Sequence, residues 1–390
     1  MMCRMEPCGN LVAALAVAMI AAGCGQSGKD EDDAVLTIYV SAPLTGPARA
    51  DGEDIADGAR QALEDAGAEA AGLRVRAEYL DVAGRNESRF DPVTAARNAR
   101  TAIEDSTSIA YIGELNSGAS RTSVPITNQA DLLQVAPGSG ASDLVRDEPF
   151  SNDVPEEVQT TGLRTFARLV PSDEAVARAG AGWVEREGAR TFLLAVFGAS
   201  SEAERRADPA SKAFTTEAES LGMRTIPIEP DVVFEPAPVP RSARGLSSPY
   251  GDVAGGNYLF MDSSIPVGRD LIGATSFRSS VVSHTLAATH LPAAGQDFAQ
   301  RFEQKYDRAP GRYAAYGYEA MASILAAIDR ASDPTDRPSV VNAYFDGAER
   351  DSVLGTYSIT DTGESTLDRI TGYRLTPDGT LEPIAELRIP

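Results

Sequence analysis

The sequence contains little cysteine and histidine, and this scarcity excludes several kinds of chemistry. Its 390 residues include three cysteines and two histidines. His284 and His290 belong to no HExxH motif and have no cysteine beside them, so we expect no metal site. No glycine-rich loop ends in the lysine that a phosphate-binding P-loop needs, and no G-x-S-x-G motif marks a nucleophilic serine. We therefore expect no cofactor and no catalysis.

The chain also lacks an excess of basic residues and a long hydrophobic run. Its formal net charge is -22, from 35 basic and 57 acidic residues, which argues against nucleic acid as a partner. The apolar run Leu11–Ala22 is shorter than the ~20 residues that cross a membrane. With Arg4 ahead of it, the run is instead typical of the core of a signal peptide.

The residues around Cys24 indicate a lipid anchor. Ala21-Ala22-Gly23-Cys24 resembles the bacterial lipobox, whose cysteine is lipidated; the alternative is an ordinary signal peptide with a chance cysteine. The polar, acidic segment Gly25–Asp33 would serve as a tether. We expect an extracytoplasmic protein that is held to the bacterial cell membrane through Cys24 alone, without a disulfide.

Beyond the tether, strands alternate with helices, which predicts a doubly wound parallel sheet. The first strand is Val35–Ser41, and Asp91-Pro92 opens a helix with Asp91 as its N-cap. The apolar positions expected to form the buried stripe of that helix are Val93, Ala96, Ala99 and Ile103. The α/β pattern restarts after Phe166–Val170, so we expect two lobes with a cleft between them.

One segment breaks this pattern. Asp231–Asn257 has several prolines and no helical or strand period, which predicts an irregular loop or a lost strand–helix unit. The boundaries that we expect are a signal peptide at 1–23, the lipidated cysteine and tether at 24–34, lobe one at 35–171 and 289–354, and lobe two at 172–288 and 355–390.

Two strands of the first lobe end in loops that suit a ligand. Ile109–Gly113 is followed by Asn116-Ser117-Gly118, and Leu132–Ala136 is followed by the Gly/Ser-rich segment Pro137–Asp143. Parallel sheets bind ligands outside the carboxyl ends of their strands, where helix N-termini offer N–H donors. The two loops predict an anion cradle that suits a carboxylate; the alternative is two tight strand-to-helix turns.

Several segments, in order, resemble the type I periplasmic solute-binding proteins of branched-chain amino acid ABC transporters, the leucine/isoleucine/valine-binding group. The matching segments are Ala42–Pro47, Ile112–Ser117, Ala136–Ser139, Arg168–Asp173 and Tyr313–Ala320. The resemblance implies two Rossmann-like α/β lobes joined by a hinge with three crossings. It also implies a small-molecule ligand and the membrane subunits of an ABC permease as partners.

The resemblance implies roles for individual residues. Ser117 would donate its hydroxyl to an amino acid's carboxylate, and Asp173 of lobe two would hold the ammonium group. The other residues with an implied place in the ligand site are Ser139 and Ala141 through the main chain, Gly140 between them, Tyr313 as a wall, and Asp262 or Ser263 as a second acidic partner. Gly140 and Asp51 depart from the family, which often has threonine and an aromatic residue there.

Each role has a structural alternative. Ser117 and Asp173 could be helix N-caps, and Tyr313 could be plain core. The function expected is capture of an amino acid or similar small carboxylate for an ABC permease. The alternatives are a ligand-sensing lipoprotein that signals to a receptor, a serine hydrolase that uses Ser117 and His284, and a degenerate homologue that has lost binding.

Overall fold

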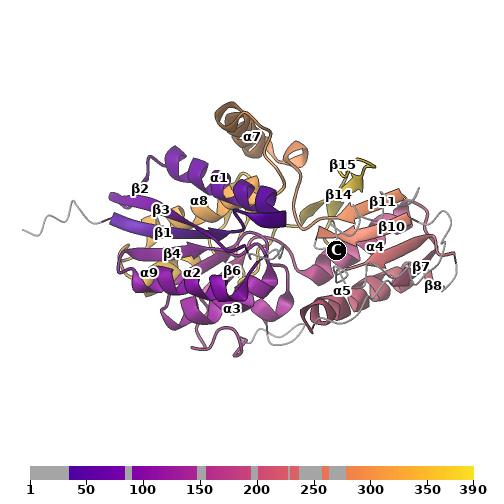
Figure 1. Cartoon of the computed structure of the whole chain (residues 1–390), viewed down its shortest axis with the longest axis horizontal. Helices are drawn as coiled ribbons and strands as arrows, with labels where there is room; N and C mark the ends of the chain where they lie inside the picture. Colours follow the sequence, from indigo (N-terminus) through magenta and orange to yellow (C-terminus); the bar gives the residue numbers. More distant parts are fainter. Residues whose placement is uncertain are drawn as a thin grey trace, which may run out of the picture. The chain divides into compact units, whose positions relative to one another are not determined.

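The computed structural model describes residues 35–83, 90–146, 155–194, 201–226, 229–236, 257–262 and 278–390. These residues form two large β-sheets with helices packed against them, and a separate two-stranded hairpin (Figure 1). Within the described ranges, no helix combines the length and apolar character that crossing a membrane requires.

The first sheet has the strand order β2-β3-β1-β4-β5-β6, and its strands are parallel except for β2. Its strands are β1 (Val35–Ala42), β2 (Glu69–Ala70), β3 (Leu73–Asp81), β4 (Ser108–Ile112), β5 (Leu133–Ala136) and β6 (Phe166–Arg168). The helices of this lobe are α1 (Arg49–Asp65), α2 (Pro92–Glu104), α3 (Ser117–Gln129), α7 (Ala293–Tyr306), α8 (Ala314–Arg330) and α9 (Arg337–Tyr344). The short hairpin β12 (Arg350–Ser352) and β13 (Gly355–Tyr357) follows α9.

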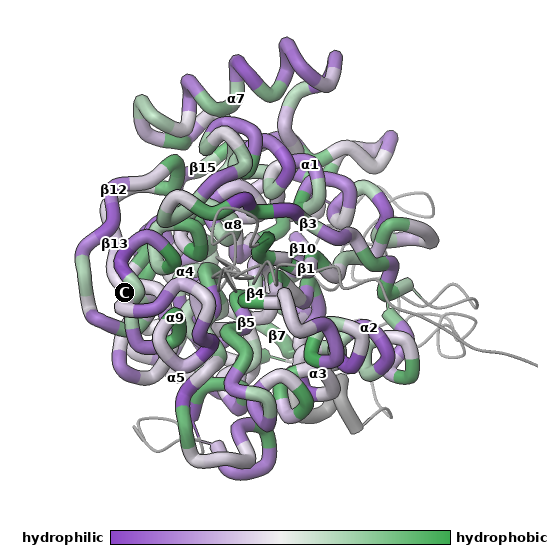
Figure 2. Tube along the Cα trace, turned by 90° about the vertical axis from the view of Figure 1, so that its left-hand side faces the viewer, coloured by the Kyte–Doolittle hydropathy of each residue, from purple (hydrophilic) through white to green (hydrophobic). Residues whose placement is uncertain are grey.

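Alternate residues of β1 point to the two faces of this sheet, as the period of a strand requires. Ile38 and Val40 join the main core under α1 and α8, whereas Tyr39 packs with Tyr111 on the other face, which α2 and α3 cover. Figure 2 shows β4 and β5 as a hydrophobic centre among helices of mixed polarity. A parallel sheet covered on both faces explains the short apolar runs in the sequence.

The second sheet has the strand order β15-β14-β11-β10-β9-β7-β8. Its strands are β7 (Thr191–Leu194), β8 (Arg224–Thr225), β9 (Val232–Glu235), β10 (Asn257–Met261), β11 (Arg278–Val282), β14 (Arg369–Leu375) and β15 (Leu381–Arg388). The strands from β8 to β11 are parallel, and β14 and β15 add an antiparallel hairpin at one edge. Helices α4 (Asp173–Arg186) and α5 (Ser201–Ser220) pack against this sheet and against each other.

The chain passes between the two sheets three times. It crosses between β6 and α4, returns between β11 and the 3₁₀ turn Ala288–His290 that precedes α7, and crosses again between β13 and β14. Two doubly wound sheets with three crossings confirm the predicted fold class. The exact residue boundaries assigned to the two lobes stay a prediction.

Two local predictions were wrong in part. Val232–Glu235, near the start of the segment 231–257, form the strand β9, which is fully buried between β10 and β7 of the second sheet. Residues 237–256 of that segment lie outside the described ranges. On α2, Val93 is 74% exposed, and the buried face instead includes the polar residues Thr94 and Asn98. Asn98 donates to the Ser41 hydroxyl and to the Asp81 carbonyl, so a stripe sought among apolar residues alone was misplaced.

Candidate ligand-binding site

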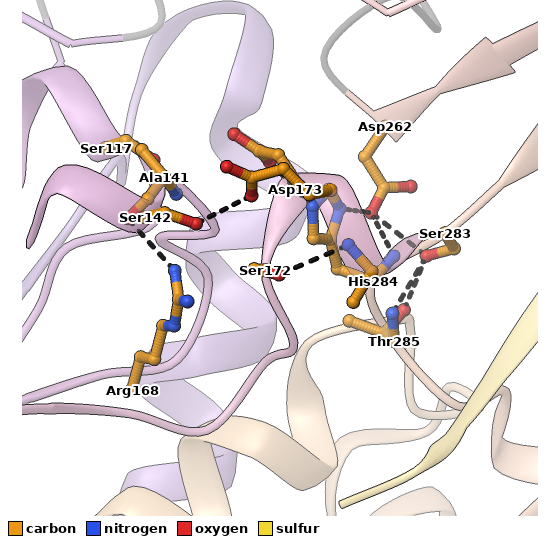
Figure 3. A network of polar contacts seen from close by, with 12 residues as sticks. Ser117, Ala141, Ser142, Arg168, Ser172, Asp173, Asp262, Ser283, His284 and Thr285 are labelled. Atoms are coloured by element: carbon orange, nitrogen blue, oxygen red, sulfur yellow. Dashed lines mark hydrogen bonds and ion pairs between the residues drawn. The ribbon is translucent and has the colours of Figure 1, made fainter. Parts of the chain in front are cut away.

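The loops after β4 and β5 contact each other in the first lobe. Ser117 is the first residue of α3 and is fully buried, and its hydroxyl oxygen accepts a hydrogen bond from the Ala141 N–H at 3.1 Å (Figure 3). A hydroxyl that accepts this bond keeps its own hydrogen to donate. The residue at the N-cap position is Asn116, so the N-cap alternative for Ser117 is wrong.

The hydroxyl of Ser139 makes hydrogen bonds inside the first lobe. It lies 2.8 Å from the Ser120 hydroxyl and donates to the Glu114 carbonyl at 3.0 Å. All three residues are buried. Ser139 can therefore contribute only main-chain groups to a ligand unless its side chain turns, which agrees with the main-chain role that the resemblance implied for it.

A buried arginine fixes the second loop. Arg168, the last residue of β6, is fully buried and donates to the Ala141 carbonyl at 2.9 Å. Arg168 also pairs with Glu364, which lies between β13 and β14. Since β6 and Glu364 lie beside two of the three crossings, Arg168 links the hinge region to the loop at Ala141, and Arg146 pairs with Glu364 as well.

Asp173 starts α4 but does not cap it. The N-cap is Ser172, whose hydroxyl accepts from the Ala175 N–H at 3.2 Å, so the N-cap alternative for Asp173 is wrong. The Asp173 N–H donates to the Gly140 carbonyl at 2.8 Å, which joins α4 to the predicted ligand loop. The Asp173 carboxylate is buried at the same place.

His284, two residues after β11, lies between Asp173 and Asp262. Its Nε2 is 2.8 Å from Asp173 Oδ1, its Nδ1 is 3.2 Å from Asp262 Oδ2, and its backbone N–H donates to the same Asp262 oxygen at 2.9 Å (Figure 3). An ionised carboxylate only accepts, so with both acids ionised both ring nitrogens donate. The pairing with two carboxylates thus favours the imidazolium form of His284, in line with its raised pKa.

Arg312 completes the contacts of Asp262 on the opposite side. It donates to Asp262 Oδ1 at 2.6 Å and to both oxygens of Asp51, in the first turn of α1, at 3.0 Å. Tyr313 follows it at the start of α8, is 3% exposed and belongs to the main core of the first lobe. Its hydroxyl is 3.5 Å from Asp262 Oδ2, so Tyr313 is core and also reaches the site.

We call these five side chains, in spatial order, the charge row: Asp173, His284, Asp262, Arg312 and Asp51. Burial works against a charge on Asp262, but the Arg312 guanidinium and the His284 imidazole hold the pKa of that carboxyl well below its usual range. Burial also works against the imidazolium, yet the hydrogen bonds to Asp173 and Asp262 raise the pKa of His284 above its ordinary value. The row therefore alternates in sign from end to end.

Gly140 explains one departure from the family pattern. A Cβ at this position would lie 2.6 Å from Asp173 Oδ1 and 2.7 Å from His284 Nε2. A side chain here would collide with the charge row, so the threonine often present in the family cannot be accommodated. The close approach also places the Asp173–His284 pair directly against the loop at Ser139–Ala141.

The structure thus brings most of the predicted site residues together. Those in or beside the charge row are Ser117, Gly140, Ala141, Asp173, Asp262, Tyr313 and Asp51. Ser263 and Cys24 lie outside the described residues. That these groups contact a ligand stays a prediction.

Sequence reasoning missed two members of the site. His284 was considered only as a partner for Ser117 or for zinc, and Arg312 was not considered. The signals available were the rarity of histidine, with two in the whole chain, and an arginine directly before the Tyr313 segment. Neither signal identifies the partners, because those of His284 are 22 and 111 positions away and those of Arg312 are 50 and 261 positions away.

The chain was compared with known proteins. No protein-family model matches it. The Leu/Ile/Val-binding protein BraC3 of Rhizobium johnstonii is 23% identical over 399 residues, which cover 94% of this chain and 95% of the relative. A solved ABC transporter substrate-binding protein of Desulfitobacterium hafniense, in complex with Leu, matches with a TM-score of 0.69 at 19% identity over 90% of this chain and 100% of that one.

The fold is that of a type I periplasmic binding protein. The resemblance predicted from the sequence is confirmed by the Leu/Ile/Val-binding relative and by this structural match. A solute-binding protein of an ABC transporter from R. palustris, in complex with benzoate, has the same fold, with a TM-score of 0.66 at 16% identity over 90% of this chain and 96% of that one. Type I periplasmic binding proteins similar to this chain thus include ones crystallised with an amino acid and with a carboxylate that has no amino group.

Proposed function

We propose that the chain is an extracytoplasmic solute-binding protein that captures an amino acid or a similar small carboxylate between its two lobes and delivers it to an ABC permease. One observation carries this proposal. The ligand loops of the first sheet meet α4 of the second lobe directly, through the Asp173 N–H on the Gly140 carbonyl at 2.8 Å and through the Ser142 hydroxyl on Glu174 at 2.6 Å.

The residues at this junction suit a small anion. The Ser117 hydroxyl retains its hydrogen, and it stands at the N-terminus of α3, where the helix dipole favours negative charge. Groups from the second lobe lie within hydrogen-bond distance of the adjoining loop. A ligand held from both lobes favours the closed arrangement over an open one, because only the closed state makes both sets of contacts.

The geometry argues against the hydrolase alternative. A serine hydrolase needs a histidine nitrogen that accepts the serine proton. Both ring nitrogens of His284 face carboxylates, and the Ser117 hydroxyl contacts Ala141 instead. The degenerate-homologue alternative also loses part of its support, since Val232–Glu235 of that segment form the buried strand β9 between β10 and β7.

Anchoring through Cys24 and transfer to a permease are further parts of the proposal. Replacing Cys24 by alanine should move the protein from the membrane fraction to the soluble fraction of cells. Deleting the gene should abolish uptake of the ligand once it is known. Unchanged uptake combined with a lost cellular response would instead favour the sensing lipoprotein.

Binding is tested by thermal denaturation of the mature protein against amino acids, amides and small organic acids. A ligand at one hundred times its dissociation constant should stabilise the fold by about 2.7 kcal/mol. Ser117→Ala should weaken the best ligand about tenfold, or about 1.4 kcal/mol, because it removes the donor. Ser220→Ala, at an exposed serine of α5, is the matched control. Equal affinities of the two variants would show that the site is misplaced.

A further inference from the structure

The acids that face the ligand loops determine which molecules the site accepts. An amino acid needs donors for its carboxylate and an acid for its ammonium group. We propose that this site takes carboxylates that lack an α-ammonium group, because His284 and Arg312 already occupy the acids that would hold one. This inference rests on the proposed function and names its ligand class.

His284 takes the place that the ammonium group of an amino acid ligand would take. It carries a positive charge between Asp173 and Asp262, is 2% exposed, and reaches Asp173 at the 2.8 Å that a ligand ammonium would need. To release Asp173, the imidazolium would have to turn away, which would also break its contact with Asp262. The ring is held on both sides, so its displacement leaves a buried charge without one of its partners.

Arg312 occupies the second acid in the same way. Its guanidinium bonds one oxygen of Asp262 at 2.6 Å while it grips both oxygens of Asp51. The other oxygen of Asp262 accepts from His284 and from the Ser283 hydroxyl at 3.0 Å. Both oxygens of Asp262 therefore have charged partners from the chain itself, and the carboxylate has no need of a ligand cation.

The position of the Asp173–His284 pair makes it selective. The pair lies so close to Gly140 that no Cβ fits between them. Ala141, whose N–H contacts the Ser117 hydroxyl, directly follows Gly140, so an α-ammonium on a carboxylate bound at Ser117 would approach the imidazolium. Two positive charges close together in a buried site repel each other strongly, so binding of a ligand with an α-ammonium group is disfavoured.

The groups at the start of α3 do not discriminate against or in favour of an ammonium group. These donors, the Ser117 hydroxyl and the N-terminus of α3, are uncharged and recognise a carboxylate irrespective of the group on the α-carbon. The site consequently selects the carboxylate through Ser117 and the N-terminus of α3, and excludes the ammonium through the charge row.

Matched ligand pairs test this proposal by calorimetry on the mature protein. The pairs are leucine and 4-methylpentanoate, phenylalanine and 3-phenylpropanoate, and glutamate and glutarate. In any pair that binds, we expect the member without nitrogen to bind at least tenfold more tightly. Tighter or equal binding of the amino acid would overturn this inference and leave the proposed function standing. Binding by no member, together with no hit in the wider panel, would contradict the proposed function and this inference with it.

A variant shows whether His284 is the cause. His284→Asn removes the cation and keeps a hydrogen-bond donor, so the preference for the nitrogen-free member should fall at least tenfold. His290→Asn, at the other histidine of the chain, should retain the wild-type preference. Circular dichroism and melting curves establish that both variants fold. An unchanged preference in a folded His284→Asn protein would contradict the proposal.

Discussion

Two buried carboxyl groups, each close behind a strand of one of the two sheets, behave in opposite ways. Glu114 lies two residues after β4, and Asp262 lies directly after β10. Both are almost fully buried. Burial raises the pKa of Glu114 to about 7, although Tyr111 and Ser41 donate hydrogen bonds to it at 2.7 and 3.0 Å. The pKa of Asp262 lies well below its usual range.

The pKa values of Glu114 and Asp262 differ because their hydrogen-bond partners differ in charge. Hydroxyl donors satisfy the hydrogen bonds of Glu114 but do not balance its charge, so the buried acid tends to be neutral. Arg312 and His284 balance the charge of Asp262, so it stays ionised. The loop after β4 therefore has a neutral, hydroxyl-bonded acid beneath it, whereas the acid after β10 is ionised and already paired. The predictions below test this contrast.

The largest effect is expected from Arg312→Gln. Removing the guanidinium leaves Asp262 and Asp51 without a shared buried cation, which should lower the free energy of unfolding by about 3–5 kcal/mol. Arg388→Gln breaks a pair whose side chains are 71% and 53% exposed and should cost about 0–1 kcal/mol. Urea denaturation measures both. Similar losses for the two variants would show that burial of the charge row does not matter.

A pH-dependent effect is expected from Glu114→Gln. The pKa of Glu114 rises from the ordinary 4.5 to about 7, so between these values the folded protein binds more protons than the unfolded chain. Stability should therefore fall as the pH rises from about 4.5 to about 7, by about 3 kcal/mol from this group. Glu114→Gln should remove that part of the dependence. Urea denaturation near pH 5 and near pH 8 measures it.

Glu319 provides a matched variant for this measurement. It is also buried, accepts a hydrogen bond from the Tyr357 hydroxyl at 2.7 Å, and burial raises its pKa to about 7. Glu319→Gln should reduce the pH dependence in the same direction, and the double variant should add the two effects. A Glu114→Gln protein with the wild-type dependence would contradict the assignment of a neutral acid beneath the ligand loop.

His284→Asn should have a smaller effect with a different pH window. Because the pKa of His284 is above its ordinary 6.5 in the folded protein, the stabilisation from its pairing is complete below about pH 6.5. That stabilisation is lost as the pH rises through the folded-state value. The variant should be less stable by about 1–3 kcal/mol near pH 6, and the difference should shrink at alkaline pH. A difference that grows with pH would contradict the imidazolium.

Gly140→Ala tests the space beside the charge row. Its Cβ would overlap Asp173 and His284, so the variant should lose about 1–3 kcal/mol. Gly182→Ala is the control, because within α4 its Cβ would meet only the end of the Arg186 side chain at 3.2 Å. That control should gain about 0.5–1 kcal/mol from helix propensity. Thermal or urea denaturation compares the two variants. A Gly140→Ala protein as stable as the wild type would mean that the charge row can shift at little energetic cost.

The sequence predicted what depends on local patterns. The strand runs, the N-cap Asp91 with Pro92, and the loops after β4 and β5 were all found, because each is specified by neighbouring residues. The strand β9 was missed because Val232–Glu235 is short and stands beside prolines that dominate the segment. A strand as short as Val232–Glu235 does not stand out when composition is averaged over the longer, proline-rich segment.

The candidate site was predicted in outline and missed in its electrostatics. Asp173 and Asp262 were identified as acids of the second lobe, but the cations that neutralise them were not. An ion pair between positions 111 or 50 residues apart depends on the folded arrangement of elements, and no periodicity in one sequence reveals it. Residue type alone does not distinguish an acid that can bind a ligand cation from an acid that is already paired with a cation of the chain.

The protonation of His284 tests the central claim most directly. The His290→Asn variant leaves His284 as the single histidine of the chain, so ¹⁵N NMR of the histidine-labelled protein reports on this ring alone. Near pH 6.5, where an ordinary imidazole is half protonated, we expect the ring to be mostly protonated at both nitrogens. A neutral ring at that pH would mean that the two acids are not neutralised from within the protein.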